Sequence, residues 1–268
     1  VLESLWVIIV YFPIDRLLFQ NGWRDFLPHV ELSVVNMDLA LSQRTVFVSG
    51  SHRGTGLVIA ERFLQEGARV IVHAPEPSML SDLDPCFDLR VTGALWTDEG
   101  TDAVVEAVKT LSPTLDVLVN NYGTAAKGDW LDTTSDQWRD MVEHNVLSVS
   151  RLTQGLLPEL KASSQARIIN LGTIGSTRPN ATMPHYYAAK GALANLTVGL
   201  AKALAGQDIT VNLVSPGLIR TPEVEAAYLK IAQKRGWGET FEAAESSTWK
   251  HVLVGAGVGA AAGGLLVT

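Results

Sequence analysis

The chain of 268 residues has little cysteine and no excess of positive charge. Its single cysteine, Cys86, excludes a disulfide within the chain, so we expect a reducing compartment, the cytoplasm. Acidic residues (28 Asp and Glu) outnumber basic residues (21 Lys and Arg) and no basic stripe is present, so a nucleic-acid partner is not expected. With 47% hydrophobic and 18% charged residues, the composition is typical of a globular protein and excludes a disordered one.

Long hydrophobic runs are missing near the start of the chain. The strongest one covers residues 5–12 and stops at Pro13, whereas a helix that spans a bilayer needs about 20 residues. No basic segment precedes it and no small-residue cleavage site follows it, so neither a transmembrane helix nor a signal peptide is expected. We interpret the run as core or docking surface; a membrane-surface anchor is the alternative.

Short apolar runs alternate with amphipathic segments from Met37 onwards. The runs are rich in β-branched residues and predict strands, whereas the segments carry apolar residues at helical spacing. Strands that alternate with helices imply parallel pairing through right-handed crossovers, and hence a single α/β domain with a doubly wound, Rossmann-like sheet. The predicted strands are residues 45–49, 69–73, 87–91, 115–120, 167–171 and 210–214, and the predicted helices include 54–66, 101–111, 135–161 and 185–205.

A glycine-rich turn connects the first predicted strand to the first predicted helix. Glycines allow a tight turn and a close approach of the backbone to a pyrophosphate, and the helix N-terminus offers N–H groups to phosphates. Three glycines alone also fit an ordinary turn, but their place between strand and helix favours a dinucleotide site. The predicted cofactor-binding residues of this turn are Gly50, Ser51, His52, Arg53, Gly54, Thr55 and Gly56.

The same turn indicates which dinucleotide binds. The guanidinium of Arg53 can pair with a 2′-phosphate, which NADP carries and NAD lacks. The second predicted strand ends at His73 and Ala74, where NAD-specific folds often place a carboxylate that holds the ribose hydroxyls. We therefore predict NADP(H) in preference to NAD; the alternative is that Arg53 is an ordinary surface arginine.

A candidate acid–base pair lies at the start of a predicted helix, where Tyr186 and Lys190 are four residues apart and share one face. A tyrosine with a pKa of about 10 is a poor proton donor at neutral pH. A neighbouring ammonium lowers that pKa because it stabilises the phenolate. Chance also produces such a pair, but this one follows Thr173 by 13 residues, at the ligand-binding edge of the predicted sheet.

Five motifs together resemble the short-chain dehydrogenase/reductase family over about residues 37–221, and they are similar to those of bacterial 3-oxoacyl reductases. The resemblance supports the doubly wound fold and implies a dinucleotide-dependent oxidoreductase. The motifs are the glycine turn 50–56, Asn120-Asn121-Tyr122-Gly123, Asn145, Tyr186-x-x-x-Lys190 and the segment 216–221.

The resemblance implies a role for each residue of the predicted active site. Tyr186 would be the general acid in carbonyl reduction, or the base in alcohol oxidation, and Lys190 would hold the nicotinamide ribose and lower the tyrosine pKa. The Thr173 hydroxyl would bond the substrate oxygen, and Asn145 would orient a water in the proton relay. Besides the turn and the Tyr–Lys pair, the residues implied to contact or border the cofactor are His73, Asn120, Gly123, Pro216, Gly217, Ile219 and Thr221.

Four residues depart from the family pattern. Thr173 stands where the family usually has serine; its branched side chain is stiffer, and Ser176 is a candidate substitute donor. Tyr122 replaces a small residue and is expected to narrow the cofactor groove. Ala94 stands where the family has an aspartate that accepts a hydrogen bond from adenine, and His52 stands where serine is common.

We predict three parts of the chain: an atypical N-terminal extension (1–36), an NADP-binding domain (37–251) and an atypical Gly/Ala-rich tail (252–268). Residues 222–250 are expected to cover the substrate, and packing of this segment onto the core is the alternative. The aromatic residues offered by this segment are Tyr228, Trp237, Phe241 and Trp249.

The predicted function is hydride transfer between NADP(H) and a small-molecule carbonyl or alcohol. A catalytically weak dinucleotide-binding sensor or scaffold on the same fold is the alternative, because function depends on the site rather than on the fold. A homodimer is expected through the helices 135–161 and 185–205, since a two-fold interface reuses one patch. The apolar residues predicted at this interface are Leu147, Val149, Leu152 and Leu156.

Overall fold

The computed structural model of the protein describes residues 38–179, 181–217, 219 and 222–240. The chain divides into two units, residues 1–39 and 40–268, and the sheet lies in the second. The apolar run 5–12, the predicted extension and the predicted tail lie outside the described residues. The predicted domain boundaries at 36 and 252 therefore stay predictions.

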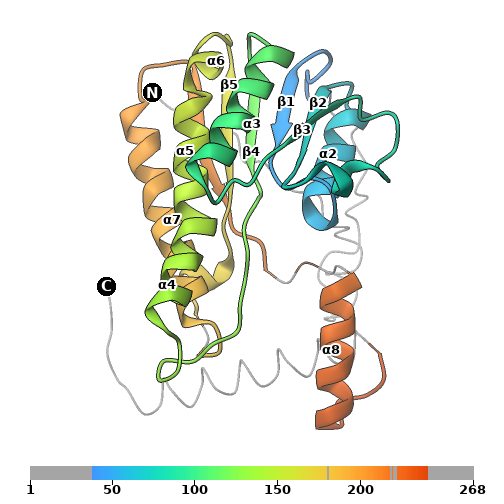
Figure 1. The fold of residues 1–268 in the computed structure, drawn as a ribbon, viewed down its shortest axis with the longest axis vertical. Coiled ribbons are helices and arrows are strands. Elements are labelled where there is room, and N and C mark those ends of the chain that lie inside the picture. Colours follow the sequence, from blue (N-terminus) through green and yellow to red (C-terminus); the bar gives the residue numbers. More distant parts are fainter. Residues whose placement is uncertain (1–37, 180, 218, 220–221, 241–268) are drawn as a thin grey trace, which may run out of the picture. The chain divides into compact units, whose positions relative to one another are not determined.

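Six parallel strands form one sheet in the order β3-β2-β1-β4-β5-β6, which confirms the predicted doubly wound fold (Figure 1). The chain adds β2 and β3 on one side of β1, and then β4, β5 and β6 on the other. The loops after β1 and β4 therefore diverge at the carboxyl edge, where such sheets bind ligands. The strands are β1 Thr45–Val48, β2 Arg69–Ala74, β3 Leu89–Thr92, β4 Val117–Asn120, β5 Ala166–Leu171 and β6 Ile209–Val214.

Helices connect the strands, close to the predicted positions. The α-helices are α2 Gly54–Gln65, α3 Asp98–Leu111, α4 Ser135–Val142, α5 Ser148–Gly155, α6 Leu157–Lys161, α7 Pro184–Ala203 and α8 Pro222–Arg235. The short elements are the 3-10 helices η2 Pro77–Leu80 and η4 Ile174–Ser176 and the π-helical turn η3 Glu143–Leu147.

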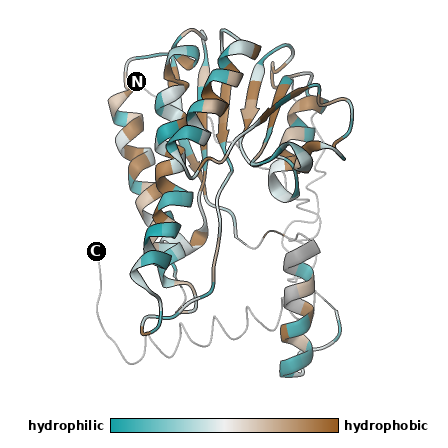
Figure 2. Ribbon diagram, viewed as in Figure 1, coloured by the Kyte–Doolittle hydropathy of each residue, from teal (hydrophilic) through white to brown (hydrophobic). Residues whose placement is uncertain are grey.

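Alternate side chains of the strands enter two hydrophobic cores, because successive residues of a strand point to opposite faces. Phe47 and Leu118 lie in the core that includes residues of α3 and α5. Val48 and Val119 lie in the core that includes Ala60 of α2. Figure 2 shows the hydrophobic colour concentrated on the strands. The central strands are thus buried on both faces, and their carboxyl ends are fixed in place.

The segment 135–161, predicted as a single helix, is helical except at Leu156, but the structure divides it into α4, η3, α5 and α6. In η3 the Nδ2 of Asn145 donates to the main-chain oxygens of Met141 (3.0 Å) and Thr124 (2.9 Å). The Met141 oxygen is the one that would pair with the N–H of residue 145 in an α-helix. The side chain competes for this acceptor, and the helix widens there.

The apolar residues predicted for a dimer interface lie mostly inside the chain. Leu152 and Leu156 are buried in the core, and Val149 is buried as well. Only Leu147 is exposed, at 40%. The prediction is therefore wrong for three of the four side chains, because a residue that packs inside its own chain has no face left for a partner.

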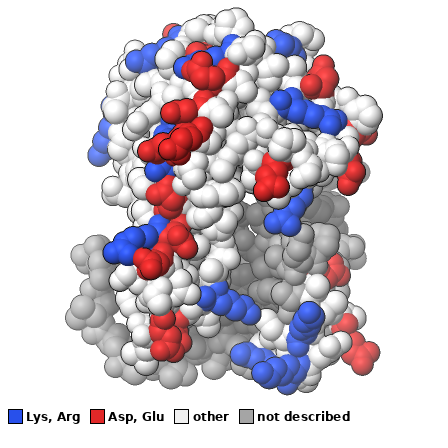
Figure 3. Space-filling view, viewed as in Figure 1, with Lys and Arg blue, Asp and Glu red and all other residues white. Residues whose placement is uncertain are grey.

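The surface of the described residues is mixed in charge. On the face seen in Figure 3, Asp and Glu side chains are interspersed with Lys and Arg. Among the described residues, no helix has both the length and the apolar character that a membrane span needs.

Candidate active site

The glycines of the turn between β1 and α2 are required by backbone conformation at two positions and by lack of space at a third. Gly50 and Gly54 have positive φ angles of 64° and 56°, which other residues rarely adopt. A Cβ added at Gly56 would lie 2.3 Å from the Gly50 oxygen and 2.4 Å from Asn121 Nδ2. The turn therefore presents its backbone at the carboxyl edge of the sheet, as phosphate binding requires.

Asn121, which was not among the predicted site residues, holds this turn from the end of β4. Its Nδ2 donates to the main-chain oxygens of Ser49 (2.9 Å) and Gly50 (3.1 Å). Ser49 Oγ accepts from the N–H groups of Asn121 (3.1 Å) and Tyr122 (3.0 Å). The turn after β1 and the loop after β4 are thus one hydrogen-bonded unit, and the signal for it was the Asn-Asn pair that ends β4.

His73, at the end of β2, supports the turn from the other side. The Gly50 N–H donates to His73 Nδ1 (2.9 Å), so Nε2 carries the proton and donates to the Gly93 oxygen (2.9 Å). Ser51 Oγ donates to the Val48 oxygen (2.7 Å) and accepts from the His73 N–H (2.9 Å). The side chains of His73 and Ser51 are fully buried, so they position the turn, and burial lowers the pKa of His73 to about 4.

The positive end of the turn is formed by Arg53 and the N-terminus of α2. Arg53 is exposed and has an extended backbone, and no side chain caps the helix. His52, beside it, is half-buried, and its pKa is lowered by burial and by the Arg53 charge. A helix N-terminus carries a partial positive charge, so the turn and Arg53 together favour an anion.

Asn145, Lys190 and Gly123 meet beyond the carboxyl ends of β4 and β5. A Cβ added at Gly123 would lie 2.6 Å from Asn145 Oδ1 and 3.5 Å from Lys190 Nζ, so a glycine is needed where these two groups approach. Lys190 is 5% exposed, its Nζ donates to the Leu171 oxygen (2.7 Å), and burial lowers its pKa to about 8. Asn145 Oδ1 is buried without a partner among the described residues, which leaves it as an acceptor.

Tyr186 is half-buried on α7, one turn before Lys190. Burial raises its pKa, and Tyr187, whose ring centroid is 5.3 Å away, adds to the rise. The prediction that Lys190 lowers the pKa of Tyr186 stays a prediction. Lys190 donates to the Leu171 oxygen, and burial of the phenol is the largest cause of the raised pKa.

Thr173 lies at the start of η4, directly after β5. Its Oγ1 accepts from the Gly175 N–H (3.2 Å), which leaves the hydroxyl proton for another acceptor. Ser176 Oγ, the candidate substitute, is buried and has no partner within the part of the chain that the structure describes. The Ile174 N–H donates to the Pro216 oxygen (3.0 Å), so the segment after β6 lies beside η4; that this segment borders the nicotinamide stays a prediction.

Asn120 lies beneath the site. Its Nδ2 donates to Asn170 Oδ1 (2.8 Å) and Thr153 Oγ1 (3.2 Å), and Asn170 Nδ2 donates to Thr197 Oγ1 (2.9 Å). These buried bonds connect β4 and β5 to α5 and α7. Asn120 thus supports the edge of the sheet from below.

The segment predicted to cover the substrate is described in part. Gly217 and Ile219 follow β6, whereas Thr221 lies outside the described residues. Trp237 follows α8, and the Arg235 guanidinium lies 4.8 Å from its ring centroid. The side chains outside the description are those of Tyr228, Phe241 and Trp249.

Comparison with known sequences agrees with this geometry. The sequence model of the short chain dehydrogenase family matches residues 44–231. An uncharacterized oxidoreductase of Bacillus subtilis, YvrD, is 34% identical over 76% of this chain and 79% of its own length. The 3-oxoacyl-[acyl-carrier-protein] reductase FabG of Vibrio cholerae is 33% identical over 69% of this chain and 78% of its own. The chain therefore belongs to the short-chain dehydrogenase family of oxidoreductases.

Solved structures show the same fold. The L-sorbose reductase of Gluconobacter frateurii, complexed with NADPH and L-sorbose, is 31% identical with a TM-score of 0.70, over 75% of this chain and 79% of that one. The RhlG/NADP complex of Pseudomonas aeruginosa is 31% identical with a TM-score of 0.65, over 76% and 88%.

The burial of His73 predicts a pH-dependent stability. Its folded-state pKa of about 4 lies below the unfolded value of 6.5, so the neutral ring stabilises the fold above pH 6.5 and this contribution is lost as the pH falls towards 4. His73→Gln retains an acceptor for Gly50 and a donor for Gly93 but does not titrate. Between pH 7.5 and 4, we expect the natural protein to lose about 3 kcal/mol more unfolding free energy than the variant, measured by urea denaturation.

Parallel losses in the two proteins would contradict this account of His73. An NMR titration of the His73 ring gives the same answer without the variant. A midpoint near the ordinary histidine value would mean that the ring is not held neutral.

Proposed function

We propose that this protein is an NADP(H)-dependent oxidoreductase that transfers a hydride between the nicotinamide and a carbonyl or alcohol carbon. The observation that carries the proposal is that Asn145 Oδ1 and Lys190 Nζ both lie close to Gly123, while Thr173 follows β5 and Tyr186 lies one helical turn before Lys190. A buried acceptor without a partner among the described residues and a glycine-rich turn at the start of α2 fit a bound dinucleotide. NADPH, when bound, supplies the hydride.

The proton would come from Tyr186. In reduction, the Tyr186 hydroxyl donates to the substrate oxygen, and the Thr173 hydroxyl donates a hydrogen bond to the same oxygen. The Lys190 ammonium stabilises the resulting phenolate, and the positive charge of the oxidised nicotinamide adds to that effect. This combination would offset the burial that raises the pKa of Tyr186 in the protein alone.

Lys190 and Asn145 would return the proton to Tyr186. The pKa of Lys190, about 8, is close to neutral pH, so this amine can both give and accept a proton. One of its hydrogens is engaged with Leu171. A water held by Asn145 Oδ1 would connect Lys190 to solvent, because buried polar groups without protein partners usually bond water.

Arg53 supports NADP as the cofactor. It is exposed beside the turn, and among the described residues no carboxylate pairs with it. His73 and Ala74, the last residues of β2, offer no carboxylate that would repel a 2′-phosphate. Two similar structures contain NADPH or NADP.

Replacement of Arg53 tests the cofactor preference. Arg53→Ala should weaken NADPH binding by about 1.5–3 kcal/mol, the usual contribution of a hydrogen bond to a charged group, and leave NADH binding nearly unchanged. Calorimetric titration measures both. The matched control is Arg62→Ala, because Arg62 lies on the exposed side of α2 and pairs only with Glu66. Equal losses for NADPH and NADH would exclude a role for Arg53 at the 2′-phosphate.

Replacement of Tyr186 tests the chemistry. NADPH consumption is first followed with a panel of ketones, quinones and 3-oxoacyl thioesters. Tyr186→Phe removes the proton donor but retains the ring, so it should lower turnover by about 10²–10⁴-fold without changing NADPH affinity. The matched control is the adjacent Tyr187→Phe, which should retain turnover. Retained activity in Tyr186→Phe would mean that this tyrosine is not the acid.

The alternative function is that of a catalytically weak dinucleotide-binding sensor or scaffold. Ala94 and Tyr122 favour it, because both change the cofactor groove relative to the family pattern. NADPH binding without consumption by any member of the panel would favour this alternative over the enzyme.

We also propose a cytoplasmic homodimer that acts on a small molecule. The exposed apolar side chains on the relevant helices are Val142 of α4, Leu147 of η3 and Val198 of α7. Light scattering at micromolar concentration should give the mass of a dimer, and Leu147→Asp should shift it towards the monomer because a buried charge opposes association. A stable tetramer, or a monomer, in the natural protein would contradict this proposal.

A further inference from the structure

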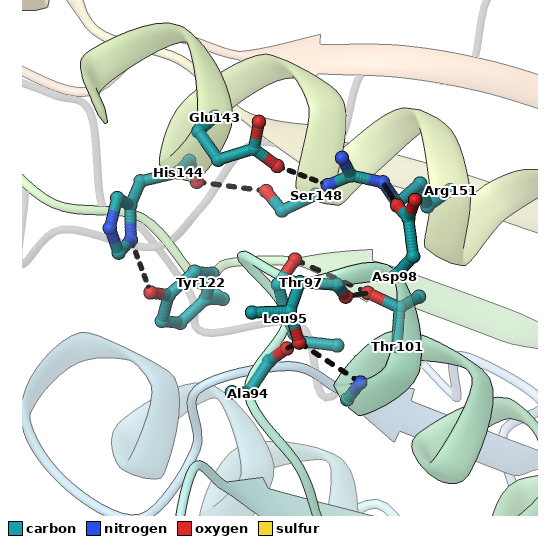
Figure 4. Close-up of polar contacts among 11 residues, drawn as sticks. Ala94, Leu95, Thr97, Asp98, Thr101, Tyr122, Glu143, His144, Ser148 and Arg151 are labelled. Atoms are coloured by element: carbon teal, nitrogen blue, oxygen red, sulfur yellow. Dashed lines mark hydrogen bonds and ion pairs between the residues drawn. The ribbon is translucent and has the colours of Figure 1, made fainter. Parts of the chain in front are cut away.

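Three aromatic side chains gather beside the glycine turn, and we call them the aromatic platform: Trp96 after β3, Tyr122 after β4 and His144 in η3. Tyr122 Oη and His144 Nδ1 are 2.6 Å apart and hydrogen-bonded, as Figure 4 shows. The Trp96 ring is stacked on Tyr122 (5.9 Å between centroids, 22° between planes) and on His144 (5.2 Å, 28°). Tyr122 therefore points towards Trp96 and His144.

Tyr122 and His144 lie on the same side of the Trp96 ring. Their own centroids are 5.9 Å apart, so the three centroids form a nearly equilateral triangle. Two rings on opposite faces of an indole would be separated by about twice that distance. Trp96 is half-buried, so part of its surface remains accessible beside these two rings.

The platform lies on the side of the sheet that receives the adenosine half of a dinucleotide. The Tyr122 Cα is 3.1 Å from a Cβ added at Gly50, and the Tyr122 ring meets the edge of His73, with 6.4 Å between centroids. These contacts place the platform next to the phosphate-binding turn. Lys190 and Asn145, beyond the ends of β4 and β5, occupy the nicotinamide side, since the dinucleotide crosses the sheet where the strand order reverses.

The main-chain oxygens of residues 93–95, in the loop that carries Trp96, accept hydrogen bonds from within the chain. The Gly93 oxygen accepts from His73 Nε2 (2.9 Å), and the Ala94 oxygen accepts from the N–H (3.1 Å) and the Oγ1 (3.3 Å) of Thr97. The Leu95 oxygen accepts from Thr101 Oγ1 (3.2 Å). The side chain of Ala94 is a methyl group. The 6-amino group of adenine is a donor, and the side chain at position 94 offers it no acceptor.

An ion-pair bridge fixes the two sides of the platform (Figure 4). Arg151 of α5 pairs with Asp98, at the start of α3, and with Glu143 of η3. The platform itself is uncharged near neutral pH, because burial lowers the pKa of His144 and raises the pKa of Tyr122. A rigid and neutral aromatic surface suits stacking on a base.

We propose that the aromatic platform binds the adenine ring of the cofactor by stacking on Trp96, and that the side chain at position 94 makes no hydrogen bond to the 6-amino group of the base. The inference rests on the proposed function for the identity of the ligand. It predicts a cofactor site that holds a purine firmly but discriminates poorly between adenine and hypoxanthine.

The stacking is tested with the full chain and adenosine 2′,5′-bisphosphate, which contains the adenosine half of NADPH and no nicotinamide. Calorimetry should show that Trp96→Leu binds it about tenfold or more weakly than the natural protein, the usual loss when a base-stacking aromatic is removed. Trp96→Phe should recover most of the affinity. The matched control is Trp138→Leu, because Trp138 lies on α4 against Trp130 and His185, and its loss should leave binding unchanged.

Discrimination between adenine and hypoxanthine is first measured on the natural protein, so that the result does not depend on the folding of a variant. NADPH and its hypoxanthine analogue should bind within about twofold of each other, because neither loses an acceptor at position 94. Ala94→Asp should then favour NADPH by about tenfold, since a carboxylate accepts from the amino group. A natural protein that already prefers NADPH tenfold would overturn the proposal, as would unchanged binding in Trp96→Leu.

These outcomes are distinct from failure of the proposed function. If the bisphosphate binds and its binding depends on Trp96, but no carbonyl compound leads to NADPH consumption, the stacking site is supported and the oxidoreductase function is contradicted. If the natural protein binds neither the bisphosphate nor NADPH, the stacking site is overturned as well.

Discussion

The contact between the glycine turn and the end of β4 is the constraint on which the site depends. Gly56 leaves no space for a Cβ against Gly50, and the Asn121 amide bonds the two carbonyls that precede the turn. This contact holds the starts of the loops after β1 and β4 together, at the point from which the two loops run to opposite sides of the sheet. The same absence of a side chain at Gly123 lets Asn145 and Lys190 approach each other. Backbone space and buried amide groups therefore determine where a cofactor fits.

The site has two halves of different chemistry on either side of this contact. On one side, Lys190 and Asn145 are buried polar groups that suit proton transfer beside a nicotinamide. On the other side, Trp96 and Tyr122 form part of a neutral aromatic surface. His73 connects the turn to the aromatic half, because its ring bonds Gly50 and the Gly93 oxygen of the loop that carries Trp96. We infer that chemistry and cofactor affinity are largely separate properties of this protein.

The fold could be predicted from sequence because local pattern and tertiary structure agree in it. Short runs of β-branched residues such as Thr45–Val48 favour strands, and the place of the glycine turn between such a run and a helix favours a dinucleotide site. The break at Asn145 could not be predicted, because it arises from a side chain that competes for a main-chain acceptor. The raised pKa of Tyr186 and the stack at Trp96 depend on burial and on residues distant in sequence. The spacing of residues in the sequence indicates neither the raised pKa nor the stack.

The most direct test of the central claim follows the hydride itself. The protein is incubated with a carbonyl compound and NADPH that carries deuterium at both positions of nicotinamide C4, and the product is analysed by mass spectrometry. The account predicts an alcohol that carries one deuterium on the former carbonyl carbon. An alcohol formed without deuterium, or no alcohol from any carbonyl compound tested while the protein binds NADPH, would contradict it.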